Sequence, residues 1–182
     1  MKRTVLLSLV MLAVATSVFA QAADDPIERA LMPAPPNMKN DATVIKWKPD
    51  FTYDVLRKGT NTLVCYDQSG WPTEPPVSLQ CTSMANLPRV AQNKKFEAIA
   101  DREARQAALA AAEKDGTRIK PEFGSLFITL GGPDKEHLHA HTTVAVPGAT
   151  GQSLGLPENN KQGGVWIMNA GTSTAHLMIP GS

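Results

Sequence analysis

Several short segments of the chain alternate hydrophobic and polar residues, which is the pattern of strands with one face in a core. Three of them precede residue 70, at 42–48 (ATVIKWK), 51–58 (FTYDVLRK) and 62–66 (TLVCY). The turn residues Gly59-Thr60-Asn61 separate the last two, so we expect 51–58 and 62–66 to form a β-hairpin. Four further strand-like segments follow: 123–130 (FGSLFITL), 140–146 (AHTTVAV), 164–169 (GVWIMN) and 175–180 (AHLMIP).

The segment 88–114 predicts one long Ala-rich helix, because it has no glycine, no proline after Pro88 and many strong helix formers. Gly116 provides a stop, and the Ala-rich face would let the helix pack closely on the sheet. A break into two helices near Asn93 is the alternative. With strands before and after the helix, the sequence predicts an α+β fold with a mainly antiparallel sheet.

A short helix is predicted between Asp25 and Pro33. Asp25 is a suitable N-cap, and Pro33 must end the helix after about two turns. Residues 34–37 (APPN) then predict a stiff extended connector.

The first twenty residues (MKRTVLLSLVMLAVATSVFA) have the organisation of a secretory signal peptide. Lys2 and Arg3 precede an apolar stretch, and small residues stand where a signal peptidase cuts after Ala20; a cut after Ala23 is the alternative. An uncleaved anchor would need a span at the short limit for a bilayer. We therefore divide the chain into a cleaved signal peptide, 1–20, and one globular domain, 21–182. Within that domain, 21–36 holds the short helix and connector, and 37–182 forms the core.

Charge excludes one class of partner. The 182 residues include 18 Lys and Arg and 17 Asp and Glu, a net charge of +1, and no basic run stands out. A nucleic-acid-binding face needs clustered cations, so we expect no nucleic-acid partner. No later segment is long and apolar enough to cross a membrane, so we expect no integral membrane protein after cleavage. The partner is then an unknown small molecule or protein.

Two cysteines, Cys65 and Cys81, stand alone in the chain without C-x-x-C proximity. In an exported protein an even cysteine count predicts a disulfide, here across a loop rich in Pro, Ser and Gly. A redox-active or metal-binding thiol pair is the alternative, which the wide spacing disfavours.

Histidines provide the one candidate chemical site. Residues 137–141 read HLHAH, and an extended strand would place His137, His139 and His141 on one face. Two imidazoles at i and i+2 could share a metal ion, with His176 from the last strand as a further ligand. Neutral imidazole suits zinc, copper, nickel or iron, so zinc or copper is the candidate cofactor.

Asp134 or Glu136 could supply a carboxylate ligand, and Met178 beside the histidines would favour copper. The alternative is an exposed strand edge or loop that carries polar rings. The spacing from Gly131 to His137 and His139 also echoes the first cupin motif, without its following glutamate. No H-E-x-x-H pattern occurs, and the G-x-S-x-G match at 151–155 (GQSLG) lies in a segment that reads as a loop, so we assign no catalytic residue and lean against an enzyme.

The order of several short segments resembles a family of exported, uncharacterised bacterial proteins. These segments are Ile27–Ala30 (IERA), Asp41–Val44 (DATV), Leu56–Asn61 (LRKGTN) before Cys65, Leu130–Gly132 (LGG), and AGT with AHLMIP within 170–180. The resemblance spans 27–180 and implies no established activity. It implies counterparts for His141 and His176, but not for His137 and His139.

Together these features predict a small exported protein of the bacterial envelope, in the periplasm or outside the cell. A disulfide stabilises it, and a binding or structural role is the leading hypothesis. The alternative is a transition-metal-binding protein or metalloenzyme that uses the histidines.

Expression in a bacterial host that exports the protein should remove the first 20 to 23 residues, because the signal peptidase cuts after small residues. Intact-mass measurement of the exported protein checks this. A full-length chain in the membrane fraction would contradict it.

Overall fold

The structure is a computed structural model that describes residues 25–179, so the expected signal peptide lies outside the described residues. In chain order the elements are α2 (Pro26–Ala30), α3 (Pro36–Lys39), β1 (Thr43–Trp47), β2 (Tyr53–Arg57), β3 (Leu63–Asp67), β4 (Val77–Ser83), η1 (Met84–Asn86), α4 (Leu87–Glu97), α5 (Arg102–Lys114), β5 (Leu126–Gly132), β6 (His139–Ala145), α6 (Gly151–Leu154), η2 (Asn160–Gln162), β7 (Trp166–Met168) and β8 (His176–Met178). Within residues 25–179, no helix has the length and apolar character of a membrane span.

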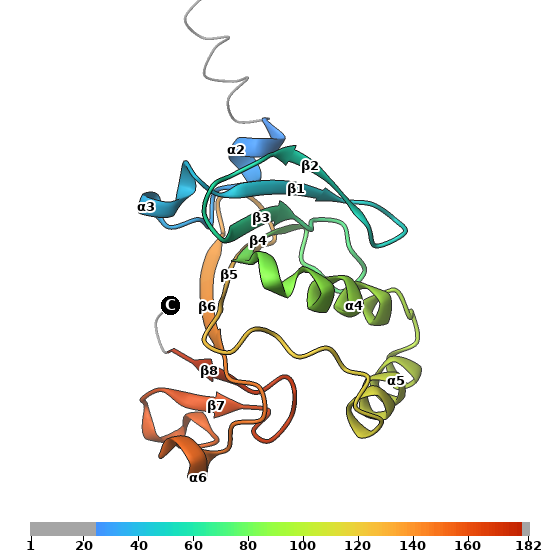
Figure 1. The fold of residues 1–182 in the computed structure, drawn as a ribbon, viewed down its shortest axis with the longest axis vertical. Helices are drawn as coiled ribbons and strands as arrows, with labels where there is room; N and C mark the ends of the chain where they lie inside the picture. Colours follow the sequence, from blue (N-terminus) through green and yellow to red (C-terminus); the bar gives the residue numbers. More distant parts are fainter. Residues whose placement is uncertain (1–24, 180–182) are drawn as a thin grey trace, which may run out of the picture.

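The eight strands within residues 25–179 form one sheet in the order β2-β1-β3-β4-β5-β6-β8-β7. Every neighbouring pair is antiparallel except β1 and β3, which run parallel. The predicted α+β fold with a mainly antiparallel sheet is therefore confirmed. In Figure 1 the strands β5 and β6 connect the part that holds β1–β4 with the part that holds β7, β8 and α6.

The expected hairpin between 51–58 and 62–66 is wrong, because β2 pairs with β1 and β3 lies on the other side of β1. The turn residues explain the difference. The amides of Thr60 and Asn61 donate to the Asp41 carbonyl at 2.8 and 3.1 Å, so the connection crosses the start of β1. A Cβ on Gly59 would lie 2.2 Å from the same carbonyl oxygen, so this crossing requires glycine.

The single helix expected over 88–114 is also wrong, since α4 ends at Glu97 and α5 starts at Arg102. Asp101 caps the second helix by accepting a hydrogen bond from the Ala104 amide at 2.7 Å. Only α4 packs on the sheet as expected; in α5 the single buried residue is Ala112. Figure 1 shows α5 beyond the end of α4, away from the strands.

The N-terminal segment belongs to the core. Asp25 caps α2 as predicted, accepting from the Ile27 amide at 2.8 Å, and Leu31 after this helix is fully buried. The extended connector expected over 34–37 is wrong in its second half, because Pro36 starts α3 and its fixed φ suits that position.

Core residues lie on both faces of the sheet. One cluster surrounds the disulfide beneath α2 and comprises Ala30, Leu31, Ala34, Ala42, Val44, Leu63, Cys65, Cys81 and Ile128. A second lies beneath α4 and comprises Ile45, Trp47, Val64, Tyr66, Leu87 and Val90. A third, around β7, comprises Val146, Ala149, Ile167 and Ala175. Successive residues of β1 face opposite clusters, as strand geometry requires.

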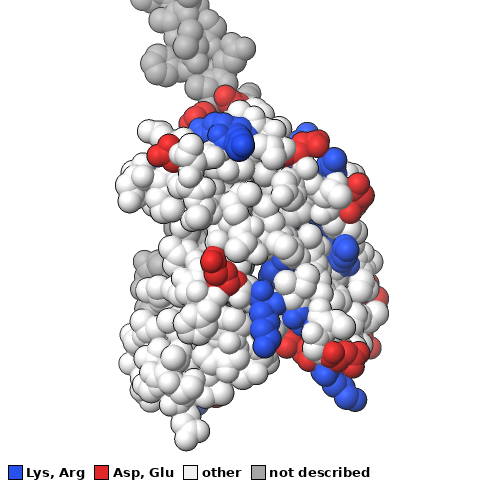
Figure 2. All heavy atoms as spheres, viewed as in Figure 1, with Lys and Arg blue, Asp and Glu red and all other residues white. Residues whose placement is uncertain are grey.

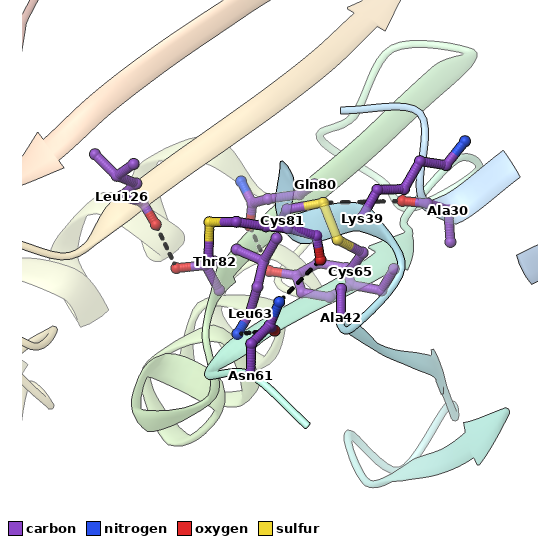
Figure 3. The surroundings of a disulfide bond; sticks show 12 residues. Ala30, Lys39, Ala42, Asn61, Leu63, Cys65, Gln80, Cys81, Thr82 and Leu126 are labelled. Atoms are coloured by element: carbon purple, nitrogen blue, oxygen red, sulfur yellow. Dashed lines mark hydrogen bonds between the residues drawn. A yellow bond between two sulfur atoms is a disulfide. The ribbon is translucent and has the colours of Figure 1, made fainter. Parts of the chain in front are cut away.

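The predicted disulfide is present between Cys65 on β3 and Cys81 on β4, which stand opposite each other in the sheet. Both cysteines are fully buried, and Cys81 Sγ lies 4.0 Å from the carbonyl oxygen of Ala30 in α2 (Figure 3). The bond therefore joins two strands at the centre of the first core cluster.

Replacing both cysteines, Cys65→Ala with Cys81→Ala, should lower the free energy of unfolding by about 3 kcal/mol, because the unfolded chain regains loop entropy. Urea unfolding measures this change, and a reductant should destabilise the native protein but not the double variant. Free thiols in the freshly purified native protein would contradict the prediction.

Candidate functional site

An open cavity of about 310 Å³ lies on the sheet face that α4 covers. Side chains of β4, β5, β6 and β8 form its floor, among them Gln80, Thr129, His141, Thr143 and His176. Arg89 and Asn93, one helical turn apart on α4, line it from the other side. The cavity thus lies between α4 and the sheet, and its floor includes β4 as well as β5, β6 and β8.

A chain of hydrogen bonds fixes part of the floor. Tyr66, Gln80, Thr129 and His141 stand side by side on four neighbouring strands. The Tyr66 hydroxyl donates to Gln80 Oε1, and Gln80 Nε2 donates to Thr129 Oγ1 at 3.2 Å. Burial raises the pKa of Tyr66 well above its ordinary value, and the carboxylates of Glu97 and Glu74 raise it further. Tyr66 therefore stays a neutral donor, and the Gln80 amide has one orientation.

Arg89 supplies a buried positive charge, with only 3% of the residue exposed. Its Nη1 donates to the carbonyl of Ile119 and, at 3.0 Å, to Ser173 Oγ. Ser173 in turn donates to Glu113 of α5 through its hydroxyl and, at 3.2 Å, its amide. Burial lowers the pKa of Arg89 to about 10, Arg118 acts in the same direction and Glu113 opposes them. The guanidinium therefore stays charged at neutral pH.

Arg118 orients the second α4 side chain of the cavity. Its Nη1 donates to Gln92 Oε1 at 2.7 Å, and its Nη2 donates to Asn93 Oδ1. The guanidinium also lies 5.0 Å from the centre of the Phe96 ring. Because Oδ1 of Asn93 is occupied, its Nδ2 is the group left to donate into the cavity.

The four histidines of the predicted metal site do not meet. His137 lies in the turn before β6, where its Nδ1 is 2.8 Å from Asp134 Oδ1. His176 stands opposite Ala145 on β6, so six residues, about 20 Å of strand, separate that position from His139. In the described part of the chain, no group of three or more His, Cys, Asp or Glu residues could hold a metal ion. The structure therefore does not assemble the zinc or copper site expected from His137, His139, His141 and His176.

Two of the histidines do line the same cavity. His141 is exposed on β6, and His176 lies half-buried on β8. His176 Nδ1 lies 2.7 Å from the Thr174 carbonyl oxygen and therefore donates to it, which leaves Nε2 to accept or donate toward a ligand. Sequence reasoning found these two residues but missed Arg89 and Asn93, for which the i, i+4 spacing on a helix was the one available signal.

A second buried cation on α4, Lys94, lies away from this cavity. It is 1% exposed, and among the described residues its Nζ has no hydrogen-bond partner. The ammonium lies 4.0 Å from the Trp71 ring centre and 5.8 Å from that of Trp47. Burial lowers the pKa of Lys94 to about 8, against the opposing effect of Glu97 and Glu74. The charge is thus held mainly by aromatic faces.

A larger groove of about 570 Å³ lies beside the start of α4, lined by Trp47, Phe51, Tyr53, Met84 and Pro88 among others. Its lining is mainly aromatic and aliphatic, so it offers few groups that fix the orientation of a ligand. The cavity at Arg89 combines apolar walls with converging polar groups, and it is the better candidate site.

Comparison with models of known families, with curated proteins and with solved structures finds no match for the chain. The resemblance to exported bacterial proteins therefore rests on the sequence segments alone.

The variant Lys94→Met should raise the free energy of unfolding by about 2 kcal/mol at pH 7, because it removes a buried charge without a hydrogen-bond partner. The unfolded chain keeps the lysine proton up to pH ~10.4, whereas the folded chain releases it near 8. The buried Lys94 charge therefore destabilises the folded protein by its full amount below pH 8. This destabilisation decreases as the pH rises toward ~10.4, so the free energy of unfolding of the native protein increases over that range.

Urea unfolding of both proteins between pH 7 and 10 measures this difference, which should shrink as the pH rises. The exposed neighbour provides a matched control, since Lys95→Met should change stability little at any pH. A difference that stays constant over the whole pH range would refute the assignment to the Lys94 charge.

Proposed function

We propose that this chain is an exported protein of the bacterial envelope that binds a small polar molecule in the cavity between α4 and the sheet. Export is supported by the signal-like residues 1–20 and by the buried disulfide, which suits an oxidising compartment such as the periplasm or the cell exterior.

One observation carries the binding proposal: polar groups without protein partners converge on the cavity. In the described part of the chain, Arg89 uses only Nη1 for protein hydrogen bonds, and neither the His141 ring nor the Thr143 hydroxyl has a protein hydrogen bond. A buried cation whose remaining donors meet no protein acceptor needs water or a ligand.

Binding is favoured over catalysis by the arrangement of the histidines. Among the described residues of the cavity, neither His141 nor His176 is hydrogen-bonded to a serine or threonine hydroxyl, as a nucleophile and its base would be. His176 instead bonds a backbone carbonyl, which fixes its ring as a rigid part of the wall.

Amide NMR of the labelled protein against pools of small polar compounds (sugars, amino acids, organic acids, nucleosides) tests the proposal. At least one compound should shift the signals of Thr129, Thr143 and His176 in a saturable manner. The substitution Thr143→Leu should weaken that binding by about tenfold or more, since it fills part of the cavity and removes a hydroxyl.

The matched control is Thr142→Leu, because successive residues of β6 face opposite sides of the sheet. It should leave the affinity within about twofold of the native protein. If no pool perturbs the cavity signals, or if all perturbations fall in the groove at Trp47, the proposed function is wrong.

A further inference from the structure

We infer that the ligand of this cavity is a small carboxylate whose charged group is bound by Arg89. The inference rests on the proposed function, because it names the class of molecule that the same site takes.

The charge around the cavity favours an anion. Among the described residues of its lining, Arg89 is the one permanent charge, and none is acidic. Glu113 lines a separate small cavity on the other side of Ser173, where it accepts hydrogen bonds from that residue. A buried cation without a carboxylate in the same cavity attracts a negatively charged ligand.

The part of the chain that contains β6, β7 and β8 supplies few other charges. From residue 138 to the C-terminus, Glu158 and Lys161 are the only charged residues. Figure 2 accordingly shows almost no charged atoms over the part formed by β7, β8 and α6 in this view. The strands β6 and β8 therefore give the cavity hydrogen-bonding groups that do not compete for the Arg89 charge.

The free edge of Arg89 matches a carboxylate rather than a point charge. Its Nη1 is held by Ile119 and Ser173, so the N–H groups of Nε and Nη2 remain, and these lie along one edge of the planar guanidinium. Two parallel N–H groups bind both oxygens of a carboxylate. A phosphate would bring a second charge, for which the described lining has no further permanent cation.

The rest of the cavity describes the body of the ligand. Phe127, Ala145 and Ala175 provide apolar surface, while Asn93 and Thr143 provide hydrogen-bonding groups. A volume of about 310 Å³ is at the small end for ligand sites, so the acid has a short organic body with one or two polar substituents.

The test titrates the purified protein with pairs of compounds that differ only in charge, followed by amide NMR. Lactate is compared with lactamide, acetate with acetamide, and succinate and the amino acids extend the series; inorganic phosphate is the competing anion. The preferred carboxylate should shift the cavity signals and bind about tenfold or more tightly than its amide, as expected for losing a charge-assisted hydrogen bond.

The substitution Arg89→Lys keeps the charge but removes the two-pronged edge, and it should weaken carboxylate binding by about tenfold or more. The control Arg102→Lys, at an exposed position on α5, should leave binding unchanged. Because Arg89 also holds Ile119 and Ser173, a melting curve checks that the variant folds. If the Arg89→Lys variant does not fold, the comparison of each acid with its amide still tests the inference, because it uses the native protein.

Equal binding of a carboxylate and its amide overturns the inference, and so does tighter binding of phosphate than of every carboxylate. If neutral compounds occupy the cavity and no carboxylate does, the inference fails while the proposed function stands. If no compound of any class shifts the cavity signals, the proposed function fails as well.

Discussion

The buried guanidinium of Arg89 joins four separate parts of the chain. It belongs to α4, contacts the carbonyl of Ile119 before β5, and reaches Glu113 of α5 through Ser173 between β7 and β8. A charge buried this deeply is tolerated only with such partners. Its position therefore depends on the correct placement of α5 and of the β7–β8 connection, and the cavity that it lines depends on both.

The sheet provides the other side of the same arrangement. Antiparallel pairing brings Gln80, Thr129 and His141 into one row across β4, β5 and β6. The row is polar although the strands run through the middle of the protein, and the hydrogen bond from Tyr66 gives Gln80 a single orientation. Polar groups that satisfy one another in this way form a rigid surface, whereas those that face the cavity without partners define where a ligand would bind.

The sequence predicted seven of the eight described strands, the disulfide and the α+β class, because these depend on local pattern and on cysteine count. It missed β4, which lies in the Pro- and Ser-containing segment between the cysteines that was expected to be a loop. It did not predict that β1 would lie between β2 and β3, since that order depends on Asp41 accepting hydrogen bonds from Thr60 and Asn61. Helix propensity alone favoured a continuous 88–114 helix, and the cap at Asp101 broke it.

The histidines show a related limit. Their alternation correctly placed His139 and His141 on one face of β6, whereas His137 lies in the turn before that strand. The register with β8, which separates His139 from His176, is set by distant contacts. Arg89 was missed because a charged residue on a helix is usually solvated, and only the tertiary partners Ile119 and Ser173 bury it.

The order of strands divides the sheet into two halves that are each continuous in the sequence. The strands β1–β4 fall within residues 43–83 and contain the whole disulfide, and β5–β8 fall within 126–178. Among the described strands, only the pairing of β4 with β5 joins the halves, across the intervening residues 84–125. Closing that long connection costs chain entropy that neither half incurs alone. Gln80 and Thr129 lie on opposite sides of this junction, so a molecule held in the cavity would act as a non-covalent clasp between two sequentially independent halves.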